Sequence, residues 1–443
     1  MIATRRSRVS FVRFFSLILV LATAGSLPFM ISAAQAASSK LLNQTDLVYQ
    51  GSFRLPQGTL PGATYGFDYA ITGFAYYPAH NSLLVNNHTY EQMTAEVSIP
   101  QIVNSTNLNN LNTAALLQNP ADITEGNLSR LGAGGATVDY GRMGGLMVYG
   151  NKLIGGSFSW YDASSSAQLS HFTSDLTLSQ TGDFHGMYKV GDLNAGFYSG
   201  YMTQIPQEWQ SAFGGPALTG NCCISIISRT SYGPAAFVFN PDDLGVKNPV
   251  PATPVVYYDA AHPTLGDWGN STTVNLYFNM STGVKAIVFP AGTRTVLFLG
   301  RQGTGVPCYG CGGSTNPGGD CANEWCYDPV DSSKGCHAYP YQAWVWAYDA
   351  NDLLSVKNGQ KNPWDIRPYS VWPLDLPVDT GSNDIQGAAY DPATRRLYVS
   401  QVYGDGAYPQ SPQYDARPII HVFSISTGGD TLAPAPPRNL LKR

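Results

Sequence analysis

The chain has 443 residues, of which only 12% are charged, with 46 glycines, 30 prolines and a formal net charge of −5 at pH 7. So few charged residues leave little material for solvated amphipathic helices, whereas frequent glycine and proline separate short strands. A mildly acidic chain without a basic stripe excludes a nucleic-acid-binding protein. We therefore expect a turn-rich, all-β protein.

Residues 1–36 are predicted to be a secretory signal peptide. They combine arginines at positions 5, 6, 8 and 13, a short apolar core over residues 14–31 and the cleavage pattern Ala34-Gln35-Ala36. Cleavage before Ala37 removes four arginines and changes the formal charge from −5 to −9. We expect a secreted protein, periplasmic or extracellular, with no membrane span after cleavage. The alternative is an uncleaved membrane anchor.

Internal repeats predict the fold. The pattern G-x-A-Y-x-P-A-x-x-x-L-x-V occurs at residues 73–85 and 387–399, and it is typical of two strands joined by a tight turn. Looser copies begin at Gly145 and Ala286. A second unit, at residues 237–244, recurs at residues 346–353.

The spacing of these repeats predicts the number of blades. The first pair is offset by 314 residues and the second by 109, which fits six units and two units slightly longer than about 50 residues. We therefore predict an all-β, single seven-bladed β-propeller over residues 37–428, with blades of about 52–55 residues. A pair of β-sandwiches is the alternative.

The ends of the propeller are predicted from the same pattern. A strand over residues 47–55 precedes the first repeat, and we expect it to pair with the last blade at residues 419–425 and close the ring. The proline-rich residues 429–443 are predicted to be a flexible tail. We expect a monomer.

Three segments of the chain resemble a group of secreted bacterial β-propeller proteins of uncharacterised function. They are residues 74–100, 220–244 and 335–349. The resemblance extends over most of the mature chain and implies a propeller fold and secretion, but it supplies no catalytic residue. Propeller-fold polysaccharide lyases, which use His, Tyr and Arg in a central cleft, share only these residue types with the chain.

A cysteine-rich insertion is predicted inside one blade. Its candidate cross-linking or metal-binding residues are Cys308, Cys311, Cys321, Cys326, Cys336 and His337. Secretion favours disulfides that staple the loop, with Cys222 or Cys223 as further partners, and the alternative is a structural zinc site. Because the chain has seven cysteines, at least one thiol is free, bound to a ligand or paired between chains. Acidic residues of the same loop would suit structural calcium, and the alternative for them is solvent exposure.

Four residues are candidates for catalysis: His88, Tyr90, His185 and Arg229. Arg229 would neutralise a substrate carboxylate, His88 or Tyr90 would take the neighbouring carbon-bound proton, and a second His or Tyr would protonate the leaving oxygen. This chemistry is β-elimination on an acidic polysaccharide. For each residue the alternative is an ordinary structural role.

Polar and aromatic side chains near predicted strand ends are candidates for substrate binding: Asn87, Gln92, Trp160, Tyr161, Trp268 and Tyr339. Flat rings at a channel mouth would stack on sugars, and the alternative is packing between blades. We therefore predict a secreted propeller that acts on or binds extracellular polysaccharide or a cell-surface glycan, as a polysaccharide lyase if it is an enzyme. The alternatives are a non-catalytic glycan- or protein-binding propeller and a metal-dependent hydrolase.

Overall fold

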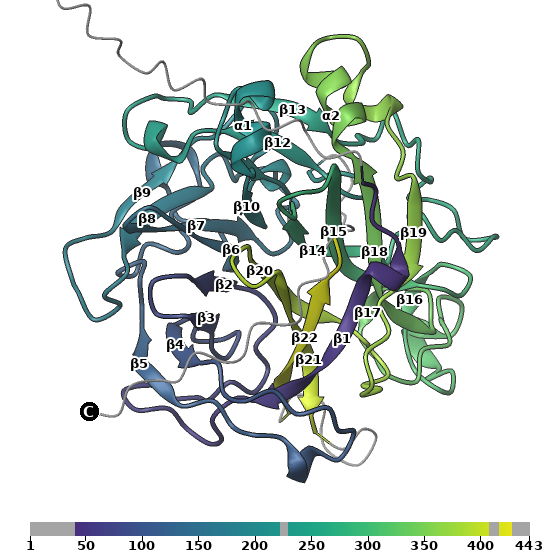
Figure 1. The fold of residues 1–443 in the computed structure, drawn as a ribbon. Helices are drawn as coiled ribbons and strands as arrows, with labels where there is room; N and C mark the ends of the chain where they lie inside the picture. The colour runs from purple at the N-terminus through teal and green to yellow at the C-terminus, as the bar shows by residue number, and fades with distance from the viewer. Residues whose placement is uncertain (1–39, 222–228, 407–415, 428–443) are drawn as a thin grey trace, which may run out of the picture. The chain divides into compact units, whose positions relative to one another are not determined.

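A computed structural model of the protein describes residues 40–221, 229–406 and 416–427 (Figure 1). The signal peptide predicted at residues 1–36, the tail predicted at residues 429–443, and Cys222 and Cys223 lie outside the described residues.

Within the described residues, five four-stranded antiparallel sheets form the blades of a β-propeller (Figure 1). Blade 1 contains β2 (Phe74–Tyr77), β3 (Ser82–Asn86), β4 (Thr94–Ser98) and β5 (Leu116–Ala121). Blade 2 contains β6 (Gly141–Tyr149), β7 (Lys152–Ser159), β8 (His171–Asp175) and β9 (His185–Tyr188). Blade 3 contains β10 (Met202–Gln204), β11 (Ala217–Thr219), β12 (Ala236–Phe239) and β13 (Ala252–Val256).

The last two blades have additions to this simple order. Blade 4 contains β14 (Gly283–Val288), β15 (Thr295–Gly303), β18 (Tyr341–Asp349) and β19 (Ser370–Pro373), with the hairpin β16 (Cys308–Cys311) and β17 (Lys334–His337) inserted. Blade 5 contains β20 (Ile385–Asp391), β21 (Arg396–Asp405), β22 (Arg417–Ile425) and the N-terminal β1 (Leu47–Arg54). The α-helices are α1 (Gln207–Phe213), between β10 and β11, and α2 (Ala350–Lys357), after β18.

Short 3-10 helices lie before β1 and in the connections between these strands. They are η1 (Gln44–Asp46), η2 (Leu108–Asn110), η3 (Ala133–Gly135), η4 (Ala195–Phe197), η5 (Pro241–Asp243), η6 (Gly319–Cys321) and η7 (Pro363–Asp365).

The N-terminal strand closes the ring. β1 pairs antiparallel with β22, with Phe53 opposite Ile420, and so forms the outer strand of blade 5. The predicted closure by an N-terminal strand is therefore confirmed. Pairing with β1 also covers the edge that β22 would otherwise present to other chains.

The predicted seven blades of about 52–55 residues are wrong, because the structure has five. The 314 residues between Ala75 and Ala389 separate the first hairpins of blades 1 and 5, which is four blade steps rather than six. The 109 residues between Phe237 and Trp346 separate the third strands of adjacent blades 3 and 4, because the inserted hairpin lengthens blade 4. Within the described residues, long connections and not additional blades account for the length of the chain.

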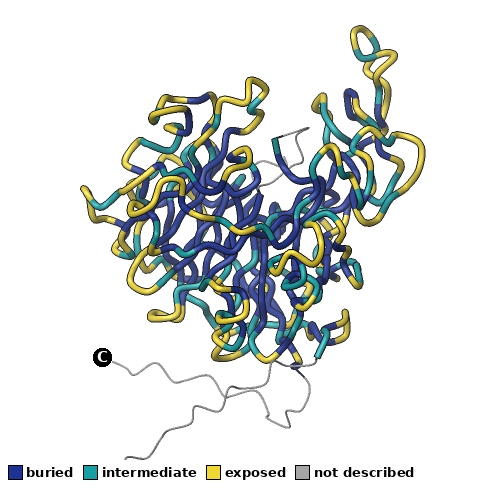
Figure 2. The backbone as a smooth tube through the Cα atoms, turned by 90° about the horizontal axis from the view of Figure 1, so that it is seen from above, coloured by how far each residue is buried: buried dark blue, intermediate teal, exposed yellow. Residues whose placement is uncertain are grey.

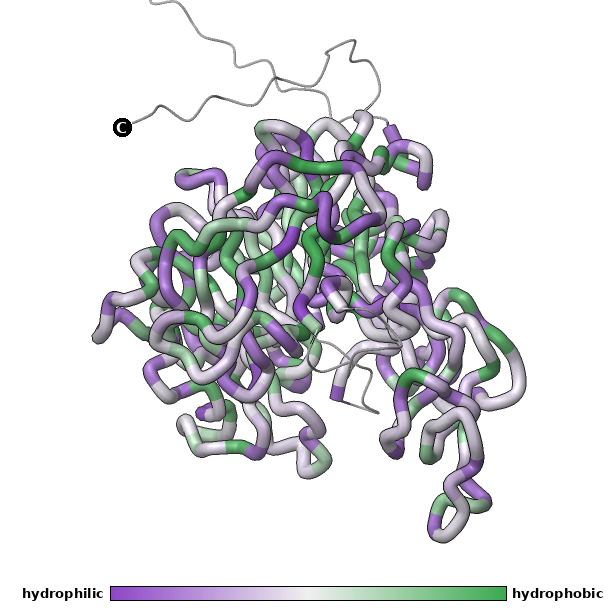
Figure 3. Tube along the Cα trace, turned by 90° about the horizontal axis from the view of Figure 1, so that it is seen from below, coloured by the Kyte–Doolittle hydropathy of each residue, from purple (hydrophilic) through white to green (hydrophobic). Residues whose placement is uncertain are grey.

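Hydrophobic clusters fill the wedge between each pair of adjacent blades. Five such clusters occur in the described residues, and one side chain from each illustrates them: Phe298, Val399, Phe53, Phe172 and Phe237. Figure 2 shows that the strands are mostly buried and the outer loops mostly exposed. Along the described chain, hydrophobic and hydrophilic residues alternate over short distances (Figure 3). None of the described helices has the length and hydropathy needed to cross a membrane.

The five inner strands, which are β2, β6, β10, β14 and β20, contact one another in a closed circuit around the centre. Their close approach requires glycine. A Cβ atom on Gly144 would lie 1.9 Å from the carbonyl oxygen of Ser199. Residues in or next to all five inner strands line a cavity of only about 10 Å³, called the narrow channel below, which has the space of a single water molecule.

The closing strand gives a stability prediction. Phe53→Ala should destabilise the mature protein by about 3–5 kcal/mol, because Phe53 is fully buried in β1 against blade 1. Val48→Ala is the matched control in the same strand, since Val48 is 47% exposed, and it should change stability by less than about 0.5 kcal/mol. Urea unfolding followed by tryptophan fluorescence measures both. Equal effects of the two substitutions would contradict a packing role for β1.

Candidate functional site

A cavity of about 740 Å³, called the central pocket below, lies where residues from all five blades meet. Each of the five blades contributes to its lining, with one example from each being Tyr69, Trp160, Arg229, Lys285 and Asp384. Lining residues come mainly from connections that lead into the first strand of a blade or join its second and third strands. In an antiparallel sheet these two kinds of connection lie at the same end, so the pocket belongs to one face of the propeller.

Lys285 lies at the bottom of the central pocket, since it lines both this pocket and the narrow channel. The pairing of β14 with β15 shifts between Val284 and Ala286, which makes Lys285 the extra residue of a β-bulge. Bulges redirect side chains and are frequent next to active sites. The Lys285 Nζ atom lies 3.5 Å from Asp384 Oδ2 and donates to the Ile71 carbonyl oxygen at 3.3 Å. Burial lowers the pKa of Lys285, although the charge of Asp384 opposes this effect.

Arg301, on β15, is a second basic residue in the lining and is half-buried. Its guanidinium carbon lies 4.5 Å from the centre of the Tyr341 ring. Desolvation alone would lower the pKa of Arg301, but the surrounding acidic groups, of which Asp384 contributes most, raise it. Arg301 is therefore positively charged at every physiological pH.

Exposed aromatic rings surround these cations. Trp160, Tyr161 and Tyr309 are 38%, 61% and 47% exposed. Trp268 lies beside Tyr309, with ring centroids 6.2 Å apart. The pocket therefore offers flat apolar surfaces at its rim and charge at its floor.

Residues 308–337, called the stapled loop below, form one wall of the central pocket. Disulfides join Cys308 to Cys326 and Cys311 to Cys321, which confirms the predicted disulfide staple. These four sulfur atoms are consequently not available to zinc, and the described residues hold no group of three or more side chains arranged as metal ligands. Cys336 has a free thiol and lines the pocket, and burial raises its pKa to about 11.

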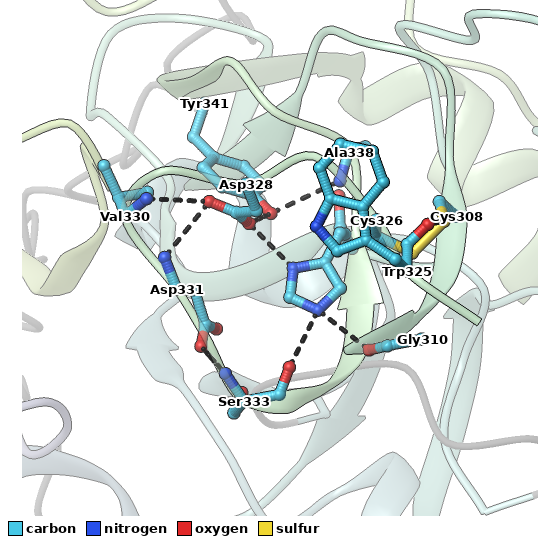
Figure 4. Close-up of polar contacts among 12 residues, drawn as sticks. Cys308, Gly310, Trp325, Cys326, Asp328, Val330, Asp331, Ser333, Ala338 and Tyr341 are labelled. Carbon is cyan, nitrogen blue, oxygen red and sulfur yellow. Dashed lines mark hydrogen bonds and ion pairs between the residues drawn. A yellow bond between two sulfur atoms is a disulfide. The ribbon is translucent and has the colours of Figure 1, made fainter. Parts of the chain in front are cut away.

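A buried ion pair orders the stapled loop. Asp328 accepts hydrogen bonds from the Tyr341 hydroxyl and from the backbone N–H groups of Val330 and Asp331 (Figure 4). His337 Nδ1 lies 2.8 Å from Asp328 Oδ2, and its Nε2 lies 3.1 Å from two backbone carbonyl oxygens. Because both ring nitrogens face acceptors, both carry a proton and the imidazole is positively charged. His337 is thus a structural cation and not a metal ligand.

The predicted acid and base residues do not meet in the central pocket. His88 is buried and stacks on Tyr65 with ring centroids 4.0 Å apart. It also contacts the Tyr69 ring edge to face, and its Nδ1 accepts from the Tyr90 N–H at 3.2 Å. Burial lowers the pKa of His88 although nearby Asp68 and Glu91 oppose it. Tyr90 is 69% exposed, and His185 lies on the outer strand of blade 2. None of the three lines the pocket.

Two predicted polar binding residues have structural contacts instead. Asn87 Nδ2 donates to Glu91, and its Oδ1 accepts from the Met93 N–H. Gln92 is buried, and its Oε1 accepts from the N–H of Met143 in blade 2. Tyr339 lies outside the lining. These three residues shape loops rather than the pocket surface.

Several predicted residues do line the central pocket: Trp160, Tyr161, Arg229, Trp268 and Cys336. Arg229 donates to the backbone carbonyl oxygens of Asp162 and Ala163 at 2.8 and 2.7 Å, so it also holds the loop that carries Trp160. Sequence reasoning missed further lining residues: Tyr69, Lys285, Arg301, Tyr309, Asp384 and Tyr403. The missed signal was a charged residue within an apolar strand, as in Val284-Lys285-Ala286.

Comparisons with known proteins leave the family open. No protein-family model matches the chain, and no curated protein matches it. Similar solved structures include a luciferin-regenerating enzyme, 6% identical with a TM-score of 0.36, where the match covers 81% of this chain and 92% of that one. Another is a glycosyl hydrolase from Bacteroides ovatus, 11% identical with a TM-score of 0.42, covering 88% and 97%. A third is Raptor from Chaetomium thermophilum, 10% identical with a TM-score of 0.30, covering 86% and 30%.

These similarities carry no argument about function. The propeller fold implied by the resemblance to secreted bacterial propellers is present, but no family match supports membership of that group. The disulfides are compatible with the predicted secretion.

The ion pair in the stapled loop predicts a pH dependence. Burial lowers the pKa of His337, but the hydrogen bond and charge of Asp328 outweigh it and raise the pKa above 6.5. The stability from His337 is therefore full below 6.5 and lost as pH rises through this raised value. For Asp328, burial is outweighed by its hydrogen bonds, led by that from His337, and its pKa falls below 3.8. The stability from Asp328 is present above 3.8 and lost as pH falls through the lowered value.

Hydrogen exchange of the stapled loop measures this dependence. We expect the amides of the stapled loop to exchange slowly near about pH 6. Near about pH 9 they should exchange faster, after correction for the intrinsic rate of exchange. His337→Ala should destabilise the loop by about 3–5 kcal/mol, because it leaves Asp328 buried without its partner. His185→Ala, on an exposed histidine, is the control. Unchanged protection in His337→Ala would contradict the proposed role of the ion pair.

Proposed function

We propose that the protein binds an extracellular polysaccharide in the central pocket, with sugar rings stacked on its aromatic side chains. The observation that supports this proposal is the exposure of several rings around one cavity, among them Trp160, Tyr161 and Tyr309. Aromatic residues that pack between blades, such as Phe298 and Trp346, are fully buried. Packing between blades therefore does not account for the exposed rings, whose apolar faces suit the apolar faces of sugars.

The charge of the lining favours an acidic polysaccharide. Four basic side chains line the pocket, Arg229, Lys285, Arg301 and Lys334, against two acidic ones, Asp331 and Asp384. The complete chain, by contrast, has a net charge of −5. A locally positive pocket on an acidic protein attracts a negatively charged ligand to that place alone.

Substitution of the rim aromatics tests the binding proposal. Trp160→Ala and Trp268→Ala should each weaken binding by about tenfold, through loss of about 1–2 kcal/mol of stacking and apolar contact. His185→Ala is the matched control, because His185 is exposed and outside the pocket. A glycan array identifies ligands and isothermal titration calorimetry measures their affinity. If the wild-type protein binds no polysaccharide, the proposal fails.

A lyase activity is the second candidate, and Lys285 is the observation that favours it. Its amine lies at the floor of the pocket, and burial lowers its pKa, which favours release of a proton and so suits a general base. In β-elimination the base takes the proton from the carbon next to the sugar carboxylate, a C=C bond forms, and the glycosidic C–O bond breaks. The proton held by Lys285 then passes to the leaving oxygen. Lys285 would thus take the role first predicted for His88.

Ultraviolet absorbance of the unsaturated product tests this activity on a panel of acidic polysaccharides. Lys285→Met should lower the rate by about 10²–10⁴-fold, the usual contribution of a general base, while ligand binding persists. His185→Ala should leave the rate unchanged. If Lys285→Met retains the wild-type rate, Lys285 is not the base; if no substrate responds, a binding protein is the remaining proposal.

A further inference from the structure

Arg301 occupies a position where its side chain is not covered by its neighbours in the sheet. It lies near the end of β15, in the middle of blade 4, and its cross-strand partners are Gly283 on β14 and Ala343 on β18. Cross-strand partners share a face of the sheet and normally fill the space beside each other. Glycine and alanine leave that space open, so the guanidinium borders the central pocket.

The guanidinium of Arg301 lacks a polar partner among the residues that the structure describes. The guanidinium lies over the face of the Tyr341 ring, 4.5 Å from its centre. A guanidinium carries five N–H donors, and a cation withdrawn from bulk water needs an anion or acceptors to offset its desolvation. The Tyr341 ring supports one face of the plane and leaves the N–H edges for a ligand.

The acidic side chains close to Arg301 are engaged elsewhere. Asp384 lies against Lys285 and accepts from a backbone N–H group. Asp328 accepts from His337 and from the Tyr341 hydroxyl. One carboxylate oxygen of Asp331 accepts both the backbone N–H and the hydroxyl of Ser333. These carboxylates keep Arg301 charged through space, but none forms an ion pair with it.

We propose that Arg301 is the ligand-binding residue for an oxyanion carried by a sugar ring, namely the carboxylate of a uronic acid or a sulfate ester. This inference rests on the proposed function, and it adds the residue that recognises the charged substituent and the chemical class of that substituent. The planar fork of arginine matches a carboxylate or sulfate through two parallel N–H···O bonds. The aromatic rim then holds the sugar ring while Arg301 selects its charged substituent.

The surroundings of Arg301 are compatible with an incoming anion. Cys336 lies in the same lining, and its pKa of about 11 keeps it an uncharged thiol near neutral pH. Lys285 lies close enough to Arg301 that the charge of Arg301 contributes to the lowered pKa of Lys285, after the larger effect of burial. An oxyanion bound by Arg301 would reduce the repulsion between the two basic side chains.

Matched acidic and neutral ligands test this inference by isothermal titration calorimetry. The probes are uronic-acid oligosaccharides with galacturonate, mannuronate and glucuronate units, each with its neutral methyl ester, and a sulfated galactan oligosaccharide with its unsulfated form. The wild-type protein should bind at least one acidic form at least about tenfold more tightly than its neutral counterpart. The pair that shows this preference identifies the oxyanion as carboxylate or sulfate.

Two substitutions of Arg301 complete the test. Arg301→Gln should abolish the preference for the acidic form and leave the affinity for the neutral form within about twofold, which also shows that the pocket is folded. Arg301→Lys, which keeps the charge but not the planar fork, should retain part of the preference. A preference that persists in Arg301→Gln overturns the inference. Equal wild-type binding of acidic and neutral forms also overturns it while the proposed function stands, and absence of all binding overturns the proposed function.

Discussion

The close approach of the five inner strands is the constraint on which the rest of the structure depends. With only five blades the ring is narrow, and glycines such as Gly144 let neighbouring backbones meet where a Cβ atom would collide. Because so little space remains between the inner strands, they form the floor of the central pocket rather than an open channel. Lys285 protrudes into this floor from a β-bulge, so the geometry that closes the ring also places a cation beneath the central pocket.

The stapled loop depends on a different kind of interaction. It inserts between β15 and β18 and has little apolar core of its own, so two disulfides and the buried pair of His337 and Asp328 order it. Tyr341 connects this pair to the pocket, because its hydroxyl donates to Asp328 and its ring lies under Arg301. Tyr341 therefore both helps to order the stapled loop and supports the guanidinium of Arg301.

Much of the fold could be predicted from the sequence. The repeats at Gly73, Gly145, Ala286 and Gly387 mark the first hairpins of four blades, and the closing strand was also apparent. The number of blades could not be predicted from the repeats, because the connections between strands differ greatly in length and the repeats are therefore not equally spaced. The first hairpin of blade 3 has no recognisable repeat, because β10 and β11 are three residues each and α1 separates them.

The site was predictable only where it lies in loops. Trp160, Tyr161, Trp268 and Arg229 stand out as aromatic or charged residues at strand ends, and all four line the pocket. His88 also stands out, but a scarce residue type says nothing about depth, and stacking on Tyr65 holds it below the surface. Lys285 and Arg301 lie inside strands, where the alternation of residues predicts only which side of the sheet each one faces. It does not predict that a β-bulge redirects Lys285. Nor does it predict that Gly283 and Ala343 leave room beside Arg301. A charge in an apolar strand is costly unless something offsets it. Arg301 contacts the Tyr341 ring but has no hydrogen-bond or ion-pair partner among the described residues, and this feature points to a ligand.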